Sequence, residues 1–404
     1  MIKEYTLKNG IKLIYKNHSS NLTSLCVSLK GGALMDGEKY GVAHATEHMV
    51  YKGTKNRTEE QINIELSEIF GFQNAMTNYP YVIYYGTLLS EDLSKGIDLF
   101  SDIIINPVFD KNGFNDEKKI IIEELKEWDE EIEQYLEDKL FINSFNNRRI
   151  KYPIIGTFES LENLKVDDIK EFYNKVYFPS NTSISIITNI EFDKVIHILE
   201  KYFGSWNKKE EELNKIVYEK NEEKYFEEVK QNIKTSKIQI NYPIDNLNNK
   251  EIKALKIFNE YFGDGVNSKL FDTLRTKYNL VYDVLTRVCY EEGIKFYKIT
   301  LSTSKENYKK AIKIIDKCVN DSLKLNERLT DKDLDKFKKS FKLKRLFREE
   351  QSIVLAKELA TFNTMFNDYN IYIDETENLD DIDLNFIVKT ITKVFDKKFI
   401  QVLK

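Results

Sequence analysis

The stretch GGALMDGEKYGVAHATEHMVYKGT covers residues 31–54 and fixes the first reference point for the fold. Its centre predicts a helix from about Val42 to Lys52, because Gly53 supplies the stop expected after a last helical turn. The segments before it, KEYTLKNG, IKLIYKN and LTSLCVSLKGG, have the alternating apolar pattern of strands. A strand-rich start that leads into this helix indicates a mixed fold with a helix packed near a sheet.

Three residues of this helix predict a metal site. His44 and His48 are four residues apart, so both imidazoles project from one helix face and fit two corners of a tetrahedral zinc site. Glu47 is offset by about 100° from His48, which suits a carboxylate that contacts a metal-bound water rather than the metal. The order H-x-x-E-H is the inverse of the familiar H-E-x-x-H motif and predicts a zinc-dependent peptidase.

A catalytic zinc needs a third protein ligand and one open position. The other two histidines are poorly placed, since His18 falls in an expected turn and His197 in a separate expected helix. A carboxylate must therefore complete the site, and a long charged helix expected from about Asn115 to Asn143 offers several. Spacing alone does not choose among these acids, which are Glu117, Glu123, Glu124 and Glu127.

Composition narrows the class of protein. The 404 residues favour two domains, and 61 basic against 66 acidic residues give a net charge of −5, without the basic excess of a nucleic-acid binder. Three widely spaced cysteines exclude a cysteine-built zinc site and favour a reducing compartment. The N-terminus does not resemble a signal peptide, and no apolar run approaches the 18 residues of a membrane span. We therefore expect a cytoplasmic protein that binds neither nucleic acid nor membrane.

The order of expected elements indicates a duplication. Strands, the motif helix, a helix capped by Thr58, two strands and more helices fill residues 1–207, and a similar series fills 233–404. The polar, charge-dense stretch 208–232 reads as a linker. We predict an α+β fold of two similar sandwich domains, each with a mixed, mostly antiparallel sheet and helices packed on one face.

The motif region resembles the pitrilysin-type peptidases, the family of insulysin and the mitochondrial processing peptidase. The matching segments are residues 31–54, then NAMT, then DEKKIIIEELKE. In that family the third ligand is a glutamate about 75 residues past the second histidine, at the end of an E-x(6)-E pattern. Counting from His48 selects Glu124, and Glu117 matches the acid that orients a histidine ligand. The resemblance thus implies one Zn²⁺ per chain, held by His44, His48 and Glu124.

Two further segments carry the resemblance. Asn74 and Ala75 match an edge strand that holds an extended substrate by backbone pairing, although Val82 replaces a threonine that the family often has nearby. SKLFDTLRTKYNLVYDVLT in the second half matches a segment whose Arg and Tyr reach the scissile region of the substrate. This assigns catalytic roles to Arg275 and Tyr282, with Asn279 where the family usually has glycine.

These features together predict a zinc-dependent endopeptidase. We expect it to cleave peptides or unfolded segments in a closed chamber, with Glu47 as general base. Relatives of about this length work as dimers, so the resemblance implies a homodimer. One alternative is an inactive or structural partner subunit, although such members typically lose a ligand or the base, and this chain keeps them all. The other is a maturation protease dedicated to one precursor peptide.

Overall fold

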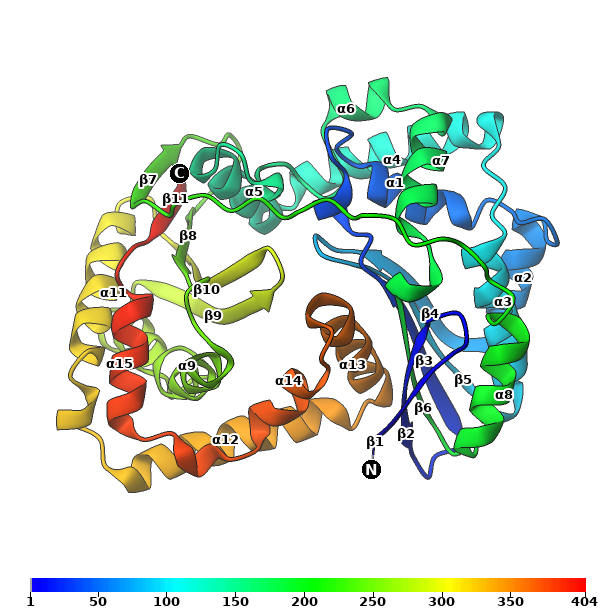
Figure 1. Cartoon of the computed structure of the whole chain (residues 1–404). Helices are drawn as coiled ribbons and strands as arrows, with labels where there is room; N and C mark the ends of the chain where they lie inside the picture. Colours follow the sequence, from blue (N-terminus) through cyan, green and yellow to red (C-terminus); the bar gives the residue numbers. More distant parts are fainter. Residues whose placement is uncertain (1) are drawn as a thin grey trace. The chain divides into compact units, whose positions relative to one another are not determined.

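The chain's contacts group into two compact units in the computed structural model, which describes residues 2–404 (Figure 1). Unit 1 consists of the residues up to Glu127, Tyr152–Ile216 and Arg348–Tyr372. Unit 2 consists of the remaining residues, Trp128–Lys151, Val217–Phe347 and Ile373–Lys404. Met1, the start of the predicted first domain, lies outside the described residues. No helix within residues 2–404 combines the length and the hydropathy of a membrane span.

Unit 1 is built on a six-stranded sheet in the order β1-β2-β6-β3-β5-β4. Only β2 and β6 pair in parallel, so the sheet is mixed and mostly antiparallel, as predicted. A hairpin turn at Lys8-Asn9-Gly10 joins β1 to β2, with Gly10 at a φ of 99°. The strands are β1 (Ile2–Thr6), β2 (Lys12–Asn17), β3 (Leu22–Leu29), β4 (Phe70–Thr77), β5 (Val82–Leu89) and β6 (Thr182–Thr188).

Unit 2 is built on a five-stranded sheet in the order β7-β11-β8-β10-β9. Its one parallel pair is β7 with β11, and the other neighbours are antiparallel. The five strands β2-β6-β3-β5-β4 of unit 1 show the same order of one parallel and three antiparallel pairings as β7-β11-β8-β10-β9. This equivalence confirms the predicted duplication. The strands are β7 (Lys224–Glu228), β8 (Ser236–Pro243), β9 (Val281–Glu291), β10 (Ile294–Thr303) and β11 (Phe399–Leu403). The segment 208–232 was expected to be a linker, but part of it forms strand β7. These residues are ordered as a strand because their backbone pairs with β11 at the edge of the sheet.

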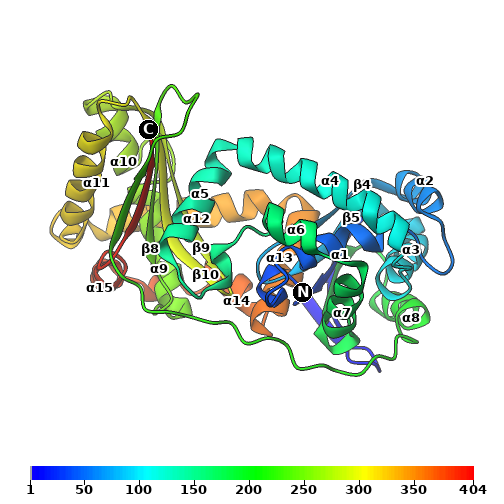
Figure 2. The ribbon, with the colours of Figure 1, turned by 90° about the horizontal axis from the view of Figure 1, so that it is seen from above.

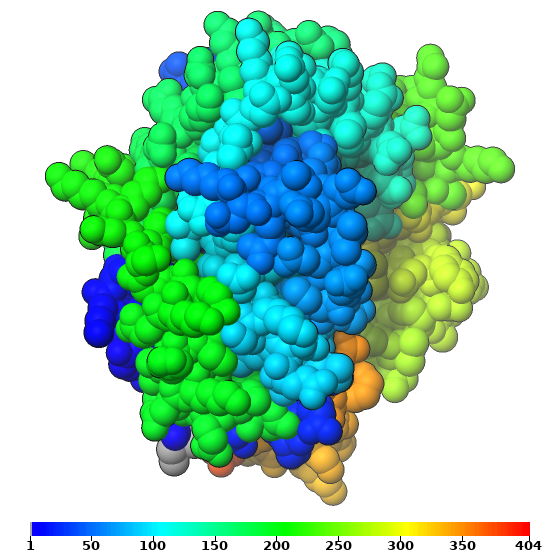
Figure 3. Space-filling model, turned by 90° about the vertical axis from the view of Figure 1, so that its right-hand side faces the viewer, coloured from blue at the N-terminus to red at the C-terminus, as the bar shows by residue number. Residues whose placement is uncertain are grey.

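The helices of unit 1 cover both faces of its sheet. Helices α2, α3 and α8 form the outer surface seen in Figure 3, and Figure 2 shows the layer from above. The helices are α1 (Val42–Val50), α2 (Glu59–Ile69), α3 (Leu93–Ile105), α4 (Lys111–Glu130), α6 (Phe158–Asn163), α7 (Val166–Val176), α8 (Phe192–Tyr202), α13 (Ser352–Phe366) and α14 (Asn370–Ile373). The C-terminal ends of α4 and α14 belong to unit 2.

The helices of unit 2 are α5 (Ile132–Ser144), α9 (Asn249–Phe262), α10 (Lys269–Phe271), α11 (Tyr308–Ser322), α12 (Asp331–Glu349) and α15 (Leu384–Val394), with the end of α12 counted in unit 1. The single long helix expected from Asn115 to Asn143 is therefore two helices. The break lies at Glu131, where ψ is 98°. It separates a helix that carries site residues of unit 1 from one that packs on the sheet of unit 2.

The two halves of the chain exchange one helix each. Helix α13, from the second half, packs on β3 and β6 of unit 1, where Ser24, Ser28 and Ser183 form hydrogen bonds of 2.8 Å to its polar side chains. Helix α5, from the first half, packs on β8 and β11 of unit 2, where Asn143 donates to Gln401 at 2.9 Å. The compact units are thus discontinuous in sequence and differ in these segments from the predicted division at 1–207 and 233–404.

The exchange follows from the polarity of the sheet. On β3, Leu25, Val27 and Leu29 are at most 1% exposed and face the main helical layer. The alternate residues, including Ser24 and Ser28, are equally buried, so the opposite face also needs a cover. The hydroxyl groups there require hydrogen-bond partners, which α13 supplies. Helices of the first half alone cover one face, as predicted, and α13 covers the other.

Candidate metal centre

Helix α1 presents the motif, and its start is fixed by residues that the motif does not contain. Gly41 precedes the helix at a φ of 88°, a left-handed conformation that glycine adopts without strain. The carboxylate of Asp36 accepts hydrogen bonds from the backbone N–H of Gly41 at 2.8 Å and of Ala43 at 2.9 Å. These bonds satisfy N–H groups at the helix start and favour the negative charge there. The role of Asp36 was not predicted from the sequence, because Asp36 lies several residues before the usual capping position.

The three expected metal ligands converge on one point. Glu124 on α4 places Oε1 3.6 Å from His44 Nε2 and Oε2 3.5 Å from His48 Nε2. A ligand atom from each of the three residues lies within 4.8 Å of the others. These separations are too long for hydrogen bonds and close to the roughly 3.3 Å that separates two ligands of a tetrahedral zinc. The donor set of two imidazoles and one carboxylate therefore fits zinc.

The geometry distinguishes Glu124 from the other candidates for the third ligand. Glu117 does not face the point of convergence but contacts His48 from behind, with Oε1 2.8 Å from His48 Nδ1. Glu123 is exposed and pairs with Lys126. His18 accepts a hydrogen bond from the backbone of Ser20, and His197 lies on α8. None of them joins the cluster.

The surroundings shift the pKa values of the two histidines in opposite directions. Burial, and then the charge of His48, lower the pKa of His44 to about 3, so its imidazole is neutral and can bind a metal at physiological pH. Burial also lowers the pKa of His48, but the hydrogen bond to Glu117 and the charges of Glu47 and Glu124 outweigh it and raise the value. The hydrogen bond to His48, followed by that to Lys52, lowers the pKa of Glu117 to about 2. Glu117 therefore accepts the Nδ1 proton of His48 and leaves Nε2 for the metal.

Glu47 lies beside the ligands and is held by a residue of the sheet. Thr77, the last residue of β4, donates from Oγ1 to Glu47 Oε2 at 2.9 Å. Burial raises the pKa of Glu47, against the opposing effects of the His48 charge and the Thr77 hydrogen bond. A carboxylate with a raised pKa is a better proton acceptor than an exposed one. Thr77 ends the NAMT segment, but its hydrogen bond to Glu47 was not predicted, because it joins two elements 30 residues apart.

The other predicted residues fall into two groups. Asn74 and Ala75 lie on β4, the strand at the edge of the sheet, three and two residues before Thr77. Arg275 and Tyr282 both lie in unit 2, where the Arg275 guanidinium sits 4.8 Å from the centre of the Tyr282 ring. Tyr282 is 81% exposed, so its hydroxyl is open to a ligand. Asn279, which stands where the family usually has glycine, has a positive φ of 49°, a conformation that asparagine tolerates better than most residues.

Two topologically equivalent α+β units, one of which carries an H-x-x-E-H helix facing a glutamate, are typical of zinc peptidases with the inverted motif. Comparison with known families agrees. The family model described as "Insulinase (Peptidase family M16)" matches residues 12–158, and the model described as "Peptidase M16 inactive domain" matches residues 163–341. The chain belongs to the M16 peptidase family.

Individual relatives give the same picture. An uncharacterized zinc protease, YmxG, of Bacillus subtilis (strain 168) is 28% identical over 287 residues, which are 70% of this chain and 69% of the relative. The beta subunit of the mitochondrial processing peptidase of Caenorhabditis elegans is 28% identical over 49% of this chain and 44% of its own length. The crystal structure of a protease from Helicobacter pylori has the same fold, with a TM-score of 0.88 at 20% identity over 100% of this chain and 99% of that one.

Proposed function

We propose that this protein is a zinc-dependent endopeptidase that cleaves peptides or unfolded segments. The observation that carries the proposal is the convergence of His44, His48 and Glu124, with Glu47 beside them. The family description termed inactive covers residues 163–341, which exclude all four of these residues. An inactive partner subunit is therefore the weaker alternative, since this chain retains a complete donor set and a base.

In this proposal, metal binding and proton transfer are performed by different residues of the chain. His44, His48 and Glu124 would hold zinc, which when bound lowers the pKa of water and polarises a carbonyl group. Glu47 accepts a proton at its carboxylate and returns it to the leaving amine. Thr77 keeps that carboxylate oriented, because its hydroxyl donates a hydrogen bond to Glu47 Oε2 at 2.9 Å.

The edge strand β4 supports a mode of substrate binding. Its inner side pairs with β5, and it ends the strand order of its sheet, so the backbone groups of its other side are available to an extended peptide. Ala75 has a small side chain that leaves room for this pairing. Backbone recognition reads little sequence, which agrees with cleavage of unfolded segments rather than of one fixed site.

Metal dependence tests the proposal directly. The purified protein should contain about one zinc per chain and cleave members of a quenched fluorescent peptide library. Removing the metal with a chelator should abolish cleavage, and added zinc should restore it. Metal-free protein that cleaves at the same rate would contradict the proposal, and zinc-loaded protein without any cleavage would favour the inactive partner.

Arg275 and Tyr282 are proposed to act on the peptide carbonyl, on the basis of the family resemblance. Arg275→Ala should lower turnover by roughly 10²-fold, the usual loss when one donor to a developing oxyanion is removed. Zinc content should not change, because Arg275 belongs to unit 2 and the ligands to unit 1. Arg287→Ala, an exposed arginine on the same strand as Tyr282, is the matched control. Loss of zinc in Arg275→Ala would refute this assignment.

The resemblance supports a homodimer, and the three widely spaced cysteines support a cytoplasmic location, both as proposals. Light scattering coupled to size-exclusion chromatography would give the mass, to be compared with 47.7 kDa for one chain. All three cysteines are free thiols, in keeping with a reducing compartment. Cys26 and Cys318 are buried, and Cys289 is partly buried.

A further inference from the structure

Lys52 makes a contact that the metal motif does not include. It lies just past the end of α1, and its Nζ is 2.9 Å from Glu117 Oε2 and 2.6 Å from Glu59 Oε1. The other oxygen of Glu117 is the one that contacts His48 Nδ1, at 2.8 Å. Each oxygen of the Glu117 carboxylate thus has its own partner, a metal ligand on one side and an ammonium group on the other.

We propose that Lys52 is a positioning residue for the metal ligand His48 and that it acts through Glu117. This inference rests on the proposed zinc site. A carboxylate held at only one oxygen can rotate about its last side-chain bond, and a rotation there would release the His48 ring. Lys52 blocks that rotation by holding Oε2, so the His48 ring keeps the orientation that directs Nε2 to the metal.

The surroundings favour a fixed Lys52. Its side chain is 19% exposed, and that of Glu117 is 9% exposed, so solvent screens the pair only partly. Glu59 contacts the same ammonium group from the first turn of α2. The start of α2 is itself fixed, because Thr58 and Gln61 form a reciprocal capping box.

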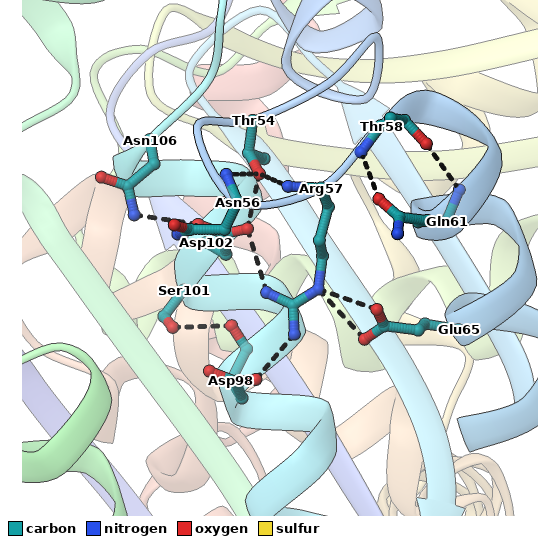
Figure 4. Close-up of polar contacts among 10 residues, drawn as sticks. All are labelled: Thr54, Asn56, Arg57, Thr58, Gln61, Glu65, Asp98, Ser101, Asp102 and Asn106. Carbon is teal, nitrogen blue, oxygen red and sulfur yellow. Dashed lines mark hydrogen bonds and ion pairs between the residues drawn. The ribbon is translucent and has the colours of Figure 1, made fainter.

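The loop between Lys52 and Glu59 is anchored by a second network (Figure 4). Thr54 donates to Asp102 at 2.6 Å, and Asn56 donates to the other oxygen of Asp102 at the same distance. Arg57 pairs with Asp102 at 3.0 Å and with Asp98 at 2.7 Å. The loop is thereby bound to α3, and Lys52 enters the site from a rigid support rather than from a mobile segment.

A lysine suits this position better than a neutral residue would. Its ammonium group donates up to three hydrogen bonds and can serve two carboxylates at once. Burial lowers the pKa of Lys52, but the hydrogen bonds to Glu59 and Glu117 outweigh this effect and raise the value, so the group is charged at neutral pH. The alternative is an ordinary ion pair between α1 and α4 that affects stability and leaves metal binding unchanged.

Metal affinity separates these two possibilities. Wild type, Lys52→Met, Lys52→Arg and Lys119→Met would be compared in zinc competition with a chromophoric chelator. Lys119 is the control, because it pairs with Asp116 on the exposed side of α4, two residues from Glu117 in sequence. We expect Lys52→Met to bind zinc about 10- to 100-fold more weakly, the usual effect of losing an outer partner of a ligand. Lys52→Arg should recover most of the affinity, and Lys119→Met should match wild type.

Two further readouts exclude a purely structural effect. In the cobalt(II)-substituted protein, Lys52→Met should change the visible absorption bands, which report ligand geometry, whereas urea unfolding of the metal-free proteins reports stability. For the zinc-loaded protein, kcat should fall and KM should stay within about 2-fold, because the ammonium group of Lys52 pairs with Glu59 and Glu117, neither of which lies on β4.

The outcomes are distinct. Equal zinc affinity and equal cobalt spectra in wild type and Lys52→Met would overturn the inference. A wild-type protein that binds neither metal would instead refute the proposed zinc site. If Lys52→Met does not fold, Lys52→Gln, which keeps an N–H donor but not the charge, replaces it in the same measurements and decides by the same criteria.

Discussion

Glu47→Gln should keep zinc bound and lower the rate of peptide cleavage by about 10²- to 10⁴-fold, the range expected when a general base is lost. The amide has almost the same shape as the carboxylate, and its oxygen can still accept the hydrogen bond from Thr77 that the structure places at 2.9 Å. Glutamine has no free carboxylate to accept a proton. The effect should therefore fall on turnover and leave the metal ligands His44, His48 and Glu124 undisturbed.

The measurement pairs zinc content with steady-state kinetics on one quenched peptide. Glu123→Gln is the matched control, because Glu123 lies beside Glu124 but is exposed and pairs with Lys126. That variant should retain wild-type rates. A Glu47→Gln protein that cleaves normally with zinc bound would show that another group accepts the proton.

Arg57→Ala should lower the free energy of unfolding by about 3–5 kcal/mol, the range for breaking a buried ion pair from one side. Arg57 contacts three carboxylates: Glu65 at 2.9 Å, Asp98 at 2.7 Å and Asp102 at 3.0 Å (Figure 4). Asp102 is 4% exposed, so removal of the guanidinium leaves a largely buried charge without its ion-pair partner. Thr54, Asn56 and Asn106 still donate to Asp102, which places the loss toward the lower end of the range.

The pH dependence adds a second test. Burial raises the pKa of Asp102, but its hydrogen bonds to Thr54, Asn106, Arg57 and Asn56 outweigh this effect and lower the value. A carboxyl group with a lowered pKa stabilises the fold above its unfolded pKa of about 3.9, and this contribution is lost as the pH falls through the folded value. The difference in stability between wild type and Arg57→Ala should therefore be largest near neutral pH and shrink in acid.

Urea unfolding at several pH values measures both effects. Arg328→Ala is the control, because Arg328 is 52% exposed and lies 3.6 Å from Asp321, so its loss should change stability by less than about 1 kcal/mol. A similarly small change in Arg57→Ala would mean that the network in Figure 4 does not anchor the loop. Zinc affinity in this variant should also fall, since the same loop carries Lys52.

Local sequence patterns predicted most of the elements. Thr58 caps α2 as expected, in a capping box with Gln61, and the two expected strands follow as β4 and β5. Each of these features depends on residues a few positions apart, which is the range over which helix and strand periodicity acts. The failures involve longer distances. The break at Glu131 and strand β7 depend on the sheet of unit 2, and neither has a proline or glycine to mark it.

The sequence by itself determined the fold class and the duplication, and it supplied the candidate residues of the proposed metal site. His44, Glu47 and His48 lie within two turns of one helix, so their relative positions follow from helix geometry alone. The E-x(6)-E spacing, through the family resemblance, added Glu124 and Glu117. Tertiary structure alone decided which groups hold these residues in place: Thr77 on Glu47, Asp36 at the start of α1, and Lys52 on Glu117. The contacts of Thr77 and Lys52 join elements far apart in the chain, and their formation depends on how the sheet and helices pack rather than on any local pattern.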